Sequence, residues 1–138
     1  MEWTRHQPNA RMRKPSSATV NFHGDILFNV KAVRQIIRES KHVEIFFSSN
    51  ADELKRVGFR FFDKPTGFSN PMKFRGNGNK GANQAVASIN TKIAVDMGIR
   101  NHTAKRFPLE FDKETEVWYI NTEKGEIFST DNYKHPKK

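Results

Sequence analysis

The residues best able to do chemistry in this chain are basic side chains in a stretch without acids. Residues 64–95 contain no Asp or Glu. Their cations are Lys64, Lys73, Arg75, Lys80 and Lys92. Cations and backbone amides of a glycine-rich segment can approach phosphates closely when no carboxylate repels them. We therefore take this stretch as the first candidate for a polyanion contact, and a solvated connector with an incidental sign bias as the alternative.

The stretch includes a glycine-rich segment, residues 75–81, with the sequence RGNGNKG. The segment lacks the spacing of Gly, Lys and Ser/Thr that defines a phosphate-binding P-loop, and it opens no long helix. A hairpin tip that follows a nucleic-acid groove suits the same residues, because Asn77 and Asn79 can bond to base edges or phosphates. We predict a nucleic-acid contact here and no nucleotide site.

Further cations lie in two predicted short helices, just beyond the second helix, and in the N-terminal arm. Each of them is also typical of an exposed helix face or a solvated tail, and that interpretation stays open. The predicted nucleic-acid-binding residues are Arg11, Arg13, Lys14, Lys31, Arg34, Lys73, Arg75, Asn77, Asn79, Lys80, Lys92, Arg100, Lys105 and Arg106. Phenylalanines in residues 46–47 and 59–62 could stack on unpaired bases, but such residues usually form core.

The residue pattern gives little indication of a catalytic site. The five His show no metal-ligand spacing, and the chain has no Cys. Asp25 with Glu53 and Lys55 resembles the carboxylate-and-lysine site of many nucleases, but short matches of this kind arise often by chance. We predict no catalytic residue, no metal and no cofactor, with nuclease activity as the alternative.

Composition favours an intracellular protein with a polyanionic partner. The net charge is +9, from 24 Lys and Arg against 15 Asp and Glu. Residues 1–14 carry +3 and residues 131–138 carry +2, so the tails hold more than half of the charge. Without cysteine, a secretory leader or a long apolar run, we expect a cytoplasmic location and no membrane partner.

The elements that must position these side chains are short strands and short helices. We predict strands at 19–22, 26–28, 43–47, 58–62, 86–89, 107–111 and 117–120, with a further short strand at 127–128. Asn29 and Asn90 suit helix N-caps, each followed by apolar residues at helical spacing. The predicted organisation is a basic arm (1–17), one domain (18–130) with a glycine-rich loop (65–81), and a basic tail (131–138).

The predicted elements repeat along the chain. The order strand, Asn, short helix, strand, strand occurs in halves at about 18–64 and 82–124, and Asn29 aligns with Asn90 at an offset of 61 residues. A unit that cannot bury its own apolar face often buries it against a copy of itself. We therefore predict an α+β, β-rich fold in which two pseudo-repeats pack as one small barrel-like domain. Two unrelated β-rich stretches are the alternative.

These residues also resemble a known family. Residues 26–37 with 43–47 and 58–62, and again 86–99 with 107–111 and 117–120, are similar to the swapped-hairpin unit of AbrB and MazE-type proteins. In that family two units interlock into a small barrel, and the resemblance implies DNA binding by a transcription regulator or antitoxin. The family usually has a Gly-and-acid turn after its helix, where the first half here has Arg38-Glu39-Ser40.

The function predicted from these observations is binding of nucleic acid, with a double-stranded DNA-binding regulator or accessory protein as the first hypothesis. The second hypothesis is a small protein-binding module or phage-type inhibitor that docks on an acidic surface of another protein. Binding of single strands is a third. The pattern leaves monomer and homodimer equally open.

Overall fold

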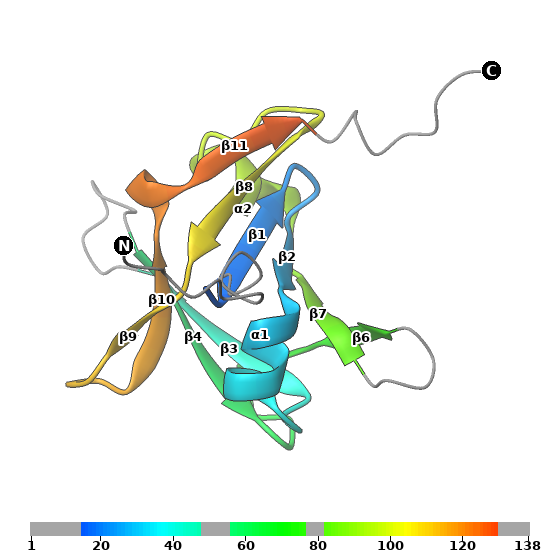
Figure 1. Cartoon of the computed structure of the whole chain (residues 1–138), viewed down its shortest axis with the longest axis vertical. Helices are drawn as coiled ribbons and strands as arrows, with labels where there is room; N and C mark the ends of the chain where they lie inside the picture. Colours follow the sequence, from blue (N-terminus) through cyan, green and yellow to red (C-terminus); the bar gives the residue numbers. More distant parts are fainter. Residues whose placement is uncertain (1–14, 48–55, 77–81, 130–138) are drawn as a thin grey trace, which may run out of the picture.

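The computed structural model describes residues 15–47, 56–76 and 82–129 of the chain. Runs of alternating apolar and polar side chains form strands here, because each strand can then turn one face to a core. Within the described residues, eleven strands form two antiparallel sheets, and the helices are few and short (Figure 1). The predicted β-rich fold is confirmed at this level. None of the helices in this part of the chain has the length and hydropathy to cross a bilayer.

The order of elements is as follows. The strands are β1 (Ser17–Asn21), β2 (Asp25–Phe28), β3 (His42–Phe47), β4 (Arg56–Phe62), β5 (Asn70–Pro71), β6 (Lys73–Gly76), β7 (Ala82–Ser88), β8 (Thr103–Pro108), β9 (Glu110–Asp112), β10 (Val117–Asn121) and β11 (Glu126–Ser129). The helical segments are α1 (Val30–Ala32), which continues into a π-helical turn η2 (Val33–Ile37), α2 (Thr91–Asp96), and a 3-10 turn η4 (Thr122–Lys124). The six-stranded sheet has the order β11-β8-β1-β2-β7-β6, and the five-stranded sheet has the order β5-β3-β4-β10-β9.

The core lies between the two sheets, where aromatic rings from both sheets meet. Phe28 on β2 is fully buried and contacts Phe59 and Phe61 on β4 edge to face, with ring centroids 5.2 and 5.4 Å apart. Such pairs contribute about 0.5–1.5 kcal/mol beyond the burial of their area. Phe59 and Phe61 are therefore core residues that join the sheets, which removes them as stacking platforms for bases.

Both short helices begin at an asparagine cap, as predicted. The Oδ1 of Asn29 accepts hydrogen bonds from the backbone N–H groups of Ala32 at 3.0 Å and Ser17 at 3.1 Å. The Oδ1 of Asn90 accepts one from the N–H of Ile93 at 3.3 Å. These bonds satisfy amides that have no partner inside the helix. Because Asn29 also binds Ser17, the first helix is attached to the start of β1.

A single glycine lets the two halves of the chain approach each other. Gly24, in the turn between β1 and β2, has a φ of +85°, and a Cβ built on it would lie 1.9 Å from the carbonyl oxygen of Asn90. Its own carbonyl accepts a hydrogen bond from the N–H of Ile89 at 3.0 Å. The turn therefore packs directly against the start of α2, and no other residue fits without a backbone shift.

The glycine-rich stretch 65–81 differs from the predicted loop. Asn70–Pro71 and Lys73–Gly76 form β5 and β6, which pair with β3 and β7. The sequence shows neither strand, because β5 has two residues and β6 has a single apolar side chain, Phe74, so no alternation marks them. Near the N-terminus, β1 begins at Ser17, a residue that the sequence analysis assigns to the basic arm (1–17).

The two sheets do not close into the predicted barrel. The six-stranded sheet ends at β11 and β6, and the five-stranded sheet ends at β5 and β9. The predicted strand at 107–111 is divided, because β8 ends at Pro108 in one sheet and β9 begins at Glu110 in the other. A proline cannot donate a ladder hydrogen bond and so suits such a break. Four neighbouring strands of each sheet run in the orders β1-β2-β7-β6 and β3-β4-β10-β9, and each run ends at an edge of its sheet.

Candidate nucleic-acid interface

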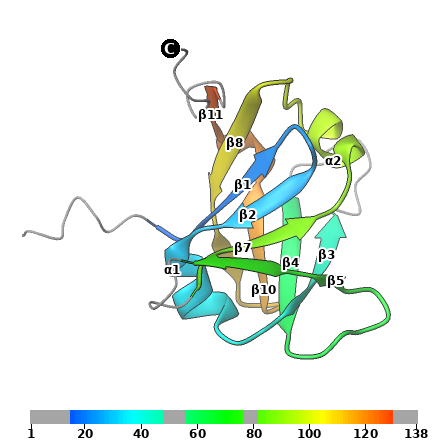
Figure 2. The same cartoon turned by 90° about the vertical axis from the view of Figure 1, so that its right-hand side faces the viewer.

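Strands β6 and β7 form a hairpin at an edge of the six-stranded sheet, and Figure 2 shows them side by side next to α1. Lys73 lies opposite Val86, and Arg75 lies opposite Gln84. Because residues two apart point to the same face of a strand, both cations share one face of the hairpin. Both side chains are exposed. The acid-free stretch therefore presents two cations on a β-ribbon.

The first helix lies at the same end of the sheet as the end of β6 and the start of β7. The segment α1 follows β2 after one residue, and both α1 and η2 contact β7. Antiparallel pairing of β2 with β7 places the start of β7 beside the end of β2. Lys31 on α1 is half-buried and Arg34 on η2 is exposed. Lys31, Arg34, Lys73 and Arg75 thus come from adjoining elements, and we call these four residues the basic end.

The cations of the basic end have no ionic partner inside the described part of the chain. An exposed ammonium or guanidinium without a carboxylate beside it keeps its full charge for a ligand. Such groups displace the counterions condensed on a nucleic acid when they reach its phosphates. The basic end therefore has the electrostatics that a phosphate contact needs.

The predicted cations around α2 lie at the opposite end of the six-stranded sheet, next to the turn between β1 and β2. Lys92 forms an exposed ion pair with Asp96 at 3.4 Å. The Nζ of Lys105 donates a hydrogen bond to the carbonyl of Met97 at 3.1 Å, so this side chain caps the end of α2. Arg100 is exposed beyond the helix. The structure does not bring these residues to the basic end.

A row across the outer face of the six-stranded sheet shows how far the cations are spread. The cross-strand register runs from Lys73 through Val86, Leu27 and Thr19 to Arg106. Four strand spacings separate the two ends of this row, roughly 19 Å. The guanidinium of Arg106 lies over an aromatic ring of β11, 5.1 Å from its centre. The three residues in the middle of this row carry no charge, so the sheet itself is not a uniform basic surface.

Six predicted contacts lie outside the described residues. They are Arg11, Arg13, Lys14, Asn77, Asn79 and Lys80. Glu53 and Lys55, which belong to the nuclease alternative, lie outside as well. Among the residues that the structure does describe, no three His, Asp or Glu side chains gather as metal ligands would.

The opposite charge gathers at the β9–β10 hairpin. Its turn carries Asp112, Glu114 and Glu116, and in Figure 1 it extends from the side of the molecule opposite the β6–β7 hairpin. A hydrogen bond from the Thr115 hydroxyl, with another from the backbone N–H of Glu114, lowers the pKa of Asp112 below its ordinary value of 3.8. That carboxylate stays ionised at neutral pH. The β9–β10 hairpin therefore carries net negative charge, with Lys113 as its one cation, and strand β6 carries net positive charge.

Sequence reasoning missed two arginines on the five-stranded sheet. The guanidinium of Arg56 lies 5.0 Å from the ring centre of Tyr119, and that of Arg60 lies 5.5 Å from the ring centre of Phe46. Phe46 is 38% exposed. The period-two spacing of Arg56 and Arg60 along β4 could have revealed that both face outward. An exposed phenylalanine beside an arginine is also the pattern that favours contacts to unpaired bases.

Two further lysines lie near the basic end. The N–H of Lys41 donates to the carbonyl of Phe62, and the carbonyl of Lys41 accepts from the N–H of Met72, both at 2.9 Å. Lys41 thus joins the end of β4 to the start of β6, and Lys64 follows two residues after β4. Both side chains are exposed, as is the neighbouring Asp63. The basic end therefore extends toward β5, and two acids, Glu39 and Asp63, line a pocket there together with Arg34.

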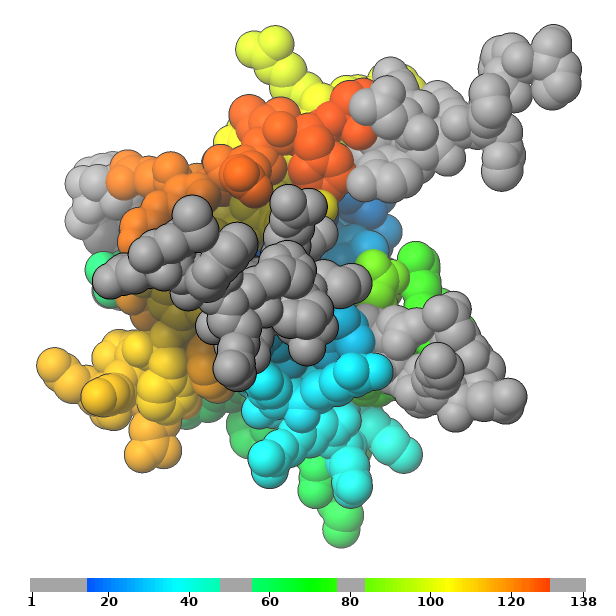
Figure 3. Space-filling model, in the orientation of Figure 1, coloured from blue at the N-terminus to red at the C-terminus, as the bar shows by residue number. Residues whose placement is uncertain are grey.

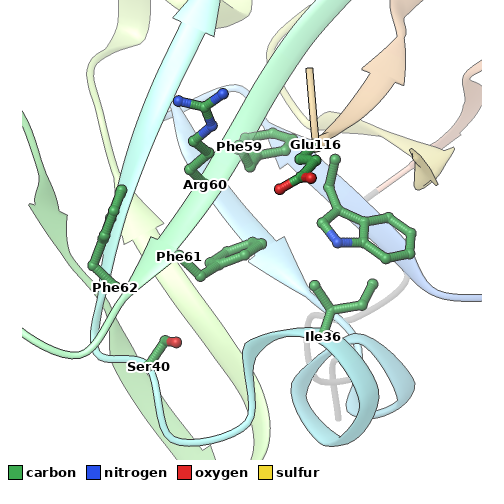
Figure 4. A pocket seen from close by; sticks show the side chains of 8 residues that line it. Ile36, Ser40, Phe59, Arg60, Phe61, Phe62 and Glu116 are labelled. Atoms are coloured by element: carbon green, nitrogen blue, oxygen red, sulfur yellow. The ribbon is translucent and has the colours of Figure 1, made fainter. Parts of the chain in front are cut away.

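An open pocket of about 330 Å³ lies between η2 and the five-stranded sheet (Figure 4). Ile36, Phe61 and Trp118 line it together with Arg60 and Glu116. The Nη2 of Arg60 donates to the carbonyl of Thr115 at 2.7 Å and so is already engaged. The pocket is an extension of the aromatic core, and no residue of the basic end lines it.

The chain matches no protein-family model, no curated protein and no solved structure. Function must therefore be argued from the site, because a fold by itself does not imply one.

Proposed function

We propose that this chain binds double-stranded DNA through the basic end, with the β6–β7 hairpin in the major groove and the first helix against the backbone. The observation that carries the proposal is that four cations without an ion-pair partner in the described chain lie on adjoining elements. Lys73 and Arg75 come from the hairpin, and Lys31 and Arg34 come from the helix beside it.

The shape of the basic end supports this mode of binding. The major groove of B-DNA is about 12 Å wide and admits a two-stranded β-ribbon. The two strands of a hairpin lie about 4.8 Å apart, so the ribbon with its side chains fits this width. Contacts of the helix cations to phosphates would set the orientation, and contacts of the hairpin to base edges would supply specificity.

The charge distribution supports an oriented approach to DNA. The β9–β10 turn carries carboxylates on the side of the molecule opposite the β6–β7 hairpin. A polyanion attracts one side of such a molecule and repels the other, which raises the rate of productive encounters. The acidic hairpin would therefore point away from the duplex.

Internal duplication is a second part of the proposal. In the orders β1-β2-β7-β6 and β3-β4-β10-β9, β2 lies beside β7 and β4 lies beside β10, and the predicted repeat would make the strands of each pair equivalent. Antiparallel neighbours of this kind are expected of two copies related by a two-fold axis. The order supports the resemblance to AbrB and MazE-type units, and with it a regulatory role on DNA in the cytoplasm.

Fluorescence anisotropy with a labelled short duplex at several salt concentrations tests the proposal. Binding should weaken steeply with salt. The variant Lys31→Ala with Arg34→Ala should lower the salt slope by about 2, one for each lost phosphate contact, whereas Lys73→Ala with Arg75→Ala should weaken binding by about 1–3 kcal/mol for each lost base contact. The matched control, Lys92→Ala with Arg100→Ala, removes two cations at the other end of the sheet and should leave the slope unchanged.

Two results would overturn the DNA proposal. One is no binding to the duplex at the lowest salt, and the other is an equal loss in the control and in the variants of the basic end. Competition with the single strand of the same sequence distinguishes the form of DNA. A single strand that competes better than the duplex would move the site to Phe46 and Arg60 on the five-stranded sheet.

A protein partner is the second candidate, and the exposed apolar residues of β3 favour it. Phe46 and Phe47 are 38% and 46% exposed, and aromatic residues beside arginines are typical of protein interfaces. If this candidate is correct, a protein should co-purify with the chain from nuclease-treated lysate. The variant Phe46→Ser should no longer retain that protein. The partner should be retained by the variant Lys73→Ala with Arg75→Ala.

A further inference from the structure

Two edge strands of this molecule have complementary sequences. Strand β6 is one edge of the six-stranded sheet and begins Lys73-Phe74-Arg75, while β9 is one edge of the five-stranded sheet and reads Glu110-Phe111-Asp112. Both central phenylalanines are partly exposed, Phe74 by 38% and Phe111 by 44%. An edge strand presents unpaired backbone groups that can hydrogen-bond to another strand.

We propose that β6 of one copy of this chain pairs in antiparallel fashion with β9 of a second copy. In that register Phe74 lies opposite Phe111, Lys73 lies opposite Asp112, and Arg75 lies opposite Glu110. The main-chain hydrogen bonds of the two edges hold the copies together, and the three side-chain pairs select the register.

The faces of the two strands agree with this register. Trp118 lies opposite Phe111 on β10, and their ring centroids are 4.9 Å apart, so Phe111 points to the core side of its sheet. The carboxylate of Glu110 accepts from the Tyr119 hydroxyl at 3.3 Å, on the outer face. Residues directly opposite each other in an antiparallel pair share a face. Pairing with β6 therefore puts both phenylalanines on one face and all four charges on the other.

The ionisation of Asp112 supports the charge pairing, whereas Glu110 already forms an ion pair with Lys124 at 3.4 Å that Arg75 would have to share. The Thr115 hydroxyl and the backbone N–H of Glu114 lower the pKa of Asp112, so its carboxylate is charged at neutral pH. The other two edges offer no such match within the described chain. Strand β5 has two residues and includes a proline, and β11 carries a single charged side chain, Glu126.

The position of the two edges determines the kind of assembly. The β9–β10 hairpin stands out from one side of the molecule, and the β6–β7 hairpin lies toward the other (Figure 3). Two copies therefore cannot satisfy both edges at once in a closed dimer. Repeated pairing of unlike surfaces gives an open, head-to-tail chain. Because each contact is only three residues long, association should be weak and should depend on concentration.

Sedimentation velocity of the nuclease-treated full chain tests this inference without DNA, so its outcome does not depend on the proposed function. At low salt the average mass should rise continuously above the monomer mass of 16.0 kDa between micromolar and millimolar protein. Added salt should reverse the rise, because the charge pairs are exposed. A mass that stays at 16.0 kDa throughout, or that stops at twice this value, would overturn the proposal.

Charge reversal tests the register. Lys73→Glu with Arg75→Glu, and separately Glu110→Lys with Asp112→Lys, should each abolish the rise in mass. The chain with all four substitutions regains complementary edges, so its association should return. Asp112→Lys also removes the hydrogen bonds that Asp112 accepts in the turn. Glu110→Lys alone leaves those bonds in place, and it should still weaken association.

Glu114→Lys is the matched control, because it changes the same charge in the same hairpin outside β9. It should leave association unchanged. Loss of association in this control, or failure of the four-fold variant to associate while it folds normally, would show that net charge and not edge pairing governs the mass.

Discussion

At the scale of single residues, the structure assigns different roles to side chains of the same type. Lys105 caps a helix, Lys92 pairs with a neighbouring acid, and Lys73 has no ionic partner in the described chain. The cations therefore differ in how much of their charge a ligand can use. Arg56 and Arg60 form a third class, because both lie over aromatic rings.

Gly24 should be the least replaceable of the described glycines. Gly24→Ala places a Cβ 1.9 Å from the carbonyl oxygen of Asn90 and forces alanine into a positive φ. The left-handed conformation alone costs about 1–2 kcal/mol, and the clash adds to it. Urea denaturation should show the loss. The control Gly67→Ala, which meets nothing within 4 Å, should be neutral or slightly stabilising.

Asp112 should give the protein a stability contribution that depends on pH. Its pKa is lower in the folded chain than the ordinary value of 3.8, so the contribution is present above that value and is lost as the pH falls through the folded pKa. Thermal unfolding between neutral and strongly acidic pH should show a smaller acid-side decrease for Thr115→Ala, which removes the hydroxyl that lowers this pKa. An unchanged acid-side decrease in that variant would contradict the assignment.

At the scale of elements, the short helices depend on their ends more than on their length. Helices of this length are not stable alone, because nucleation costs more than a few hydrogen bonds return. Asparagine caps and packing against the core therefore decide whether they form. The π-helical turn η2, closed by the bond from the Arg38 N–H to the Val33 carbonyl at 2.6 Å, ends the first helix.

The two caps should differ in strength. Asn29→Ala removes bonds to Ala32 and Ser17 and the donation to the carbonyl of Pro15 at 2.9 Å, whereas Asn90→Ala removes only the bond to Ile93. We expect a loss of about 2 kcal/mol for Asn29→Ala and about 1 kcal/mol for Asn90→Ala in chemical denaturation. An equal loss for both would mean that the attachment of β1 contributes nothing.

At the scale of the whole molecule, the two hairpins give the chain two unlike sides. The β6–β7 hairpin is basic, and the β9–β10 hairpin is acidic. The same cations of β6 serve both proposals, so DNA and the acidic edge of a second copy would compete for them. The acidic edge would then act as a substitute for phosphates in the absence of DNA.

Competition between the two partners is therefore expected. Addition of a short duplex to self-associated protein should lower its average mass toward one chain per duplex, measured by sedimentation with absorbance at two wavelengths. Lys31→Ala with Arg34→Ala removes cations that only DNA uses, so it should weaken this effect of DNA while it leaves self-association intact. Simultaneous DNA binding and undiminished chain growth would show that the two surfaces are separate.

Sequence patterning by itself determined the strands with clear alternation, the two asparagine caps and the β-rich class. These features are local, since a period of two and a side chain that bonds three residues ahead can be read from neighbouring positions. The acid-free stretch and its cations are equally visible in composition. The local sequence pattern is therefore enough to name the candidate binding residues, including all four residues of the basic end.

Only the tertiary structure decided which of those candidates belong together. Strands β5 and β6 form because a neighbouring strand supplies hydrogen-bond partners, and no pattern in residues 65–81 encodes that neighbour. The two open sheets in place of a barrel, and the separation of Lys92 and Arg106 from the basic end, depend in the same way on pairings between distant segments. Such pairings are set by the burial of the common core, which single positions do not reveal.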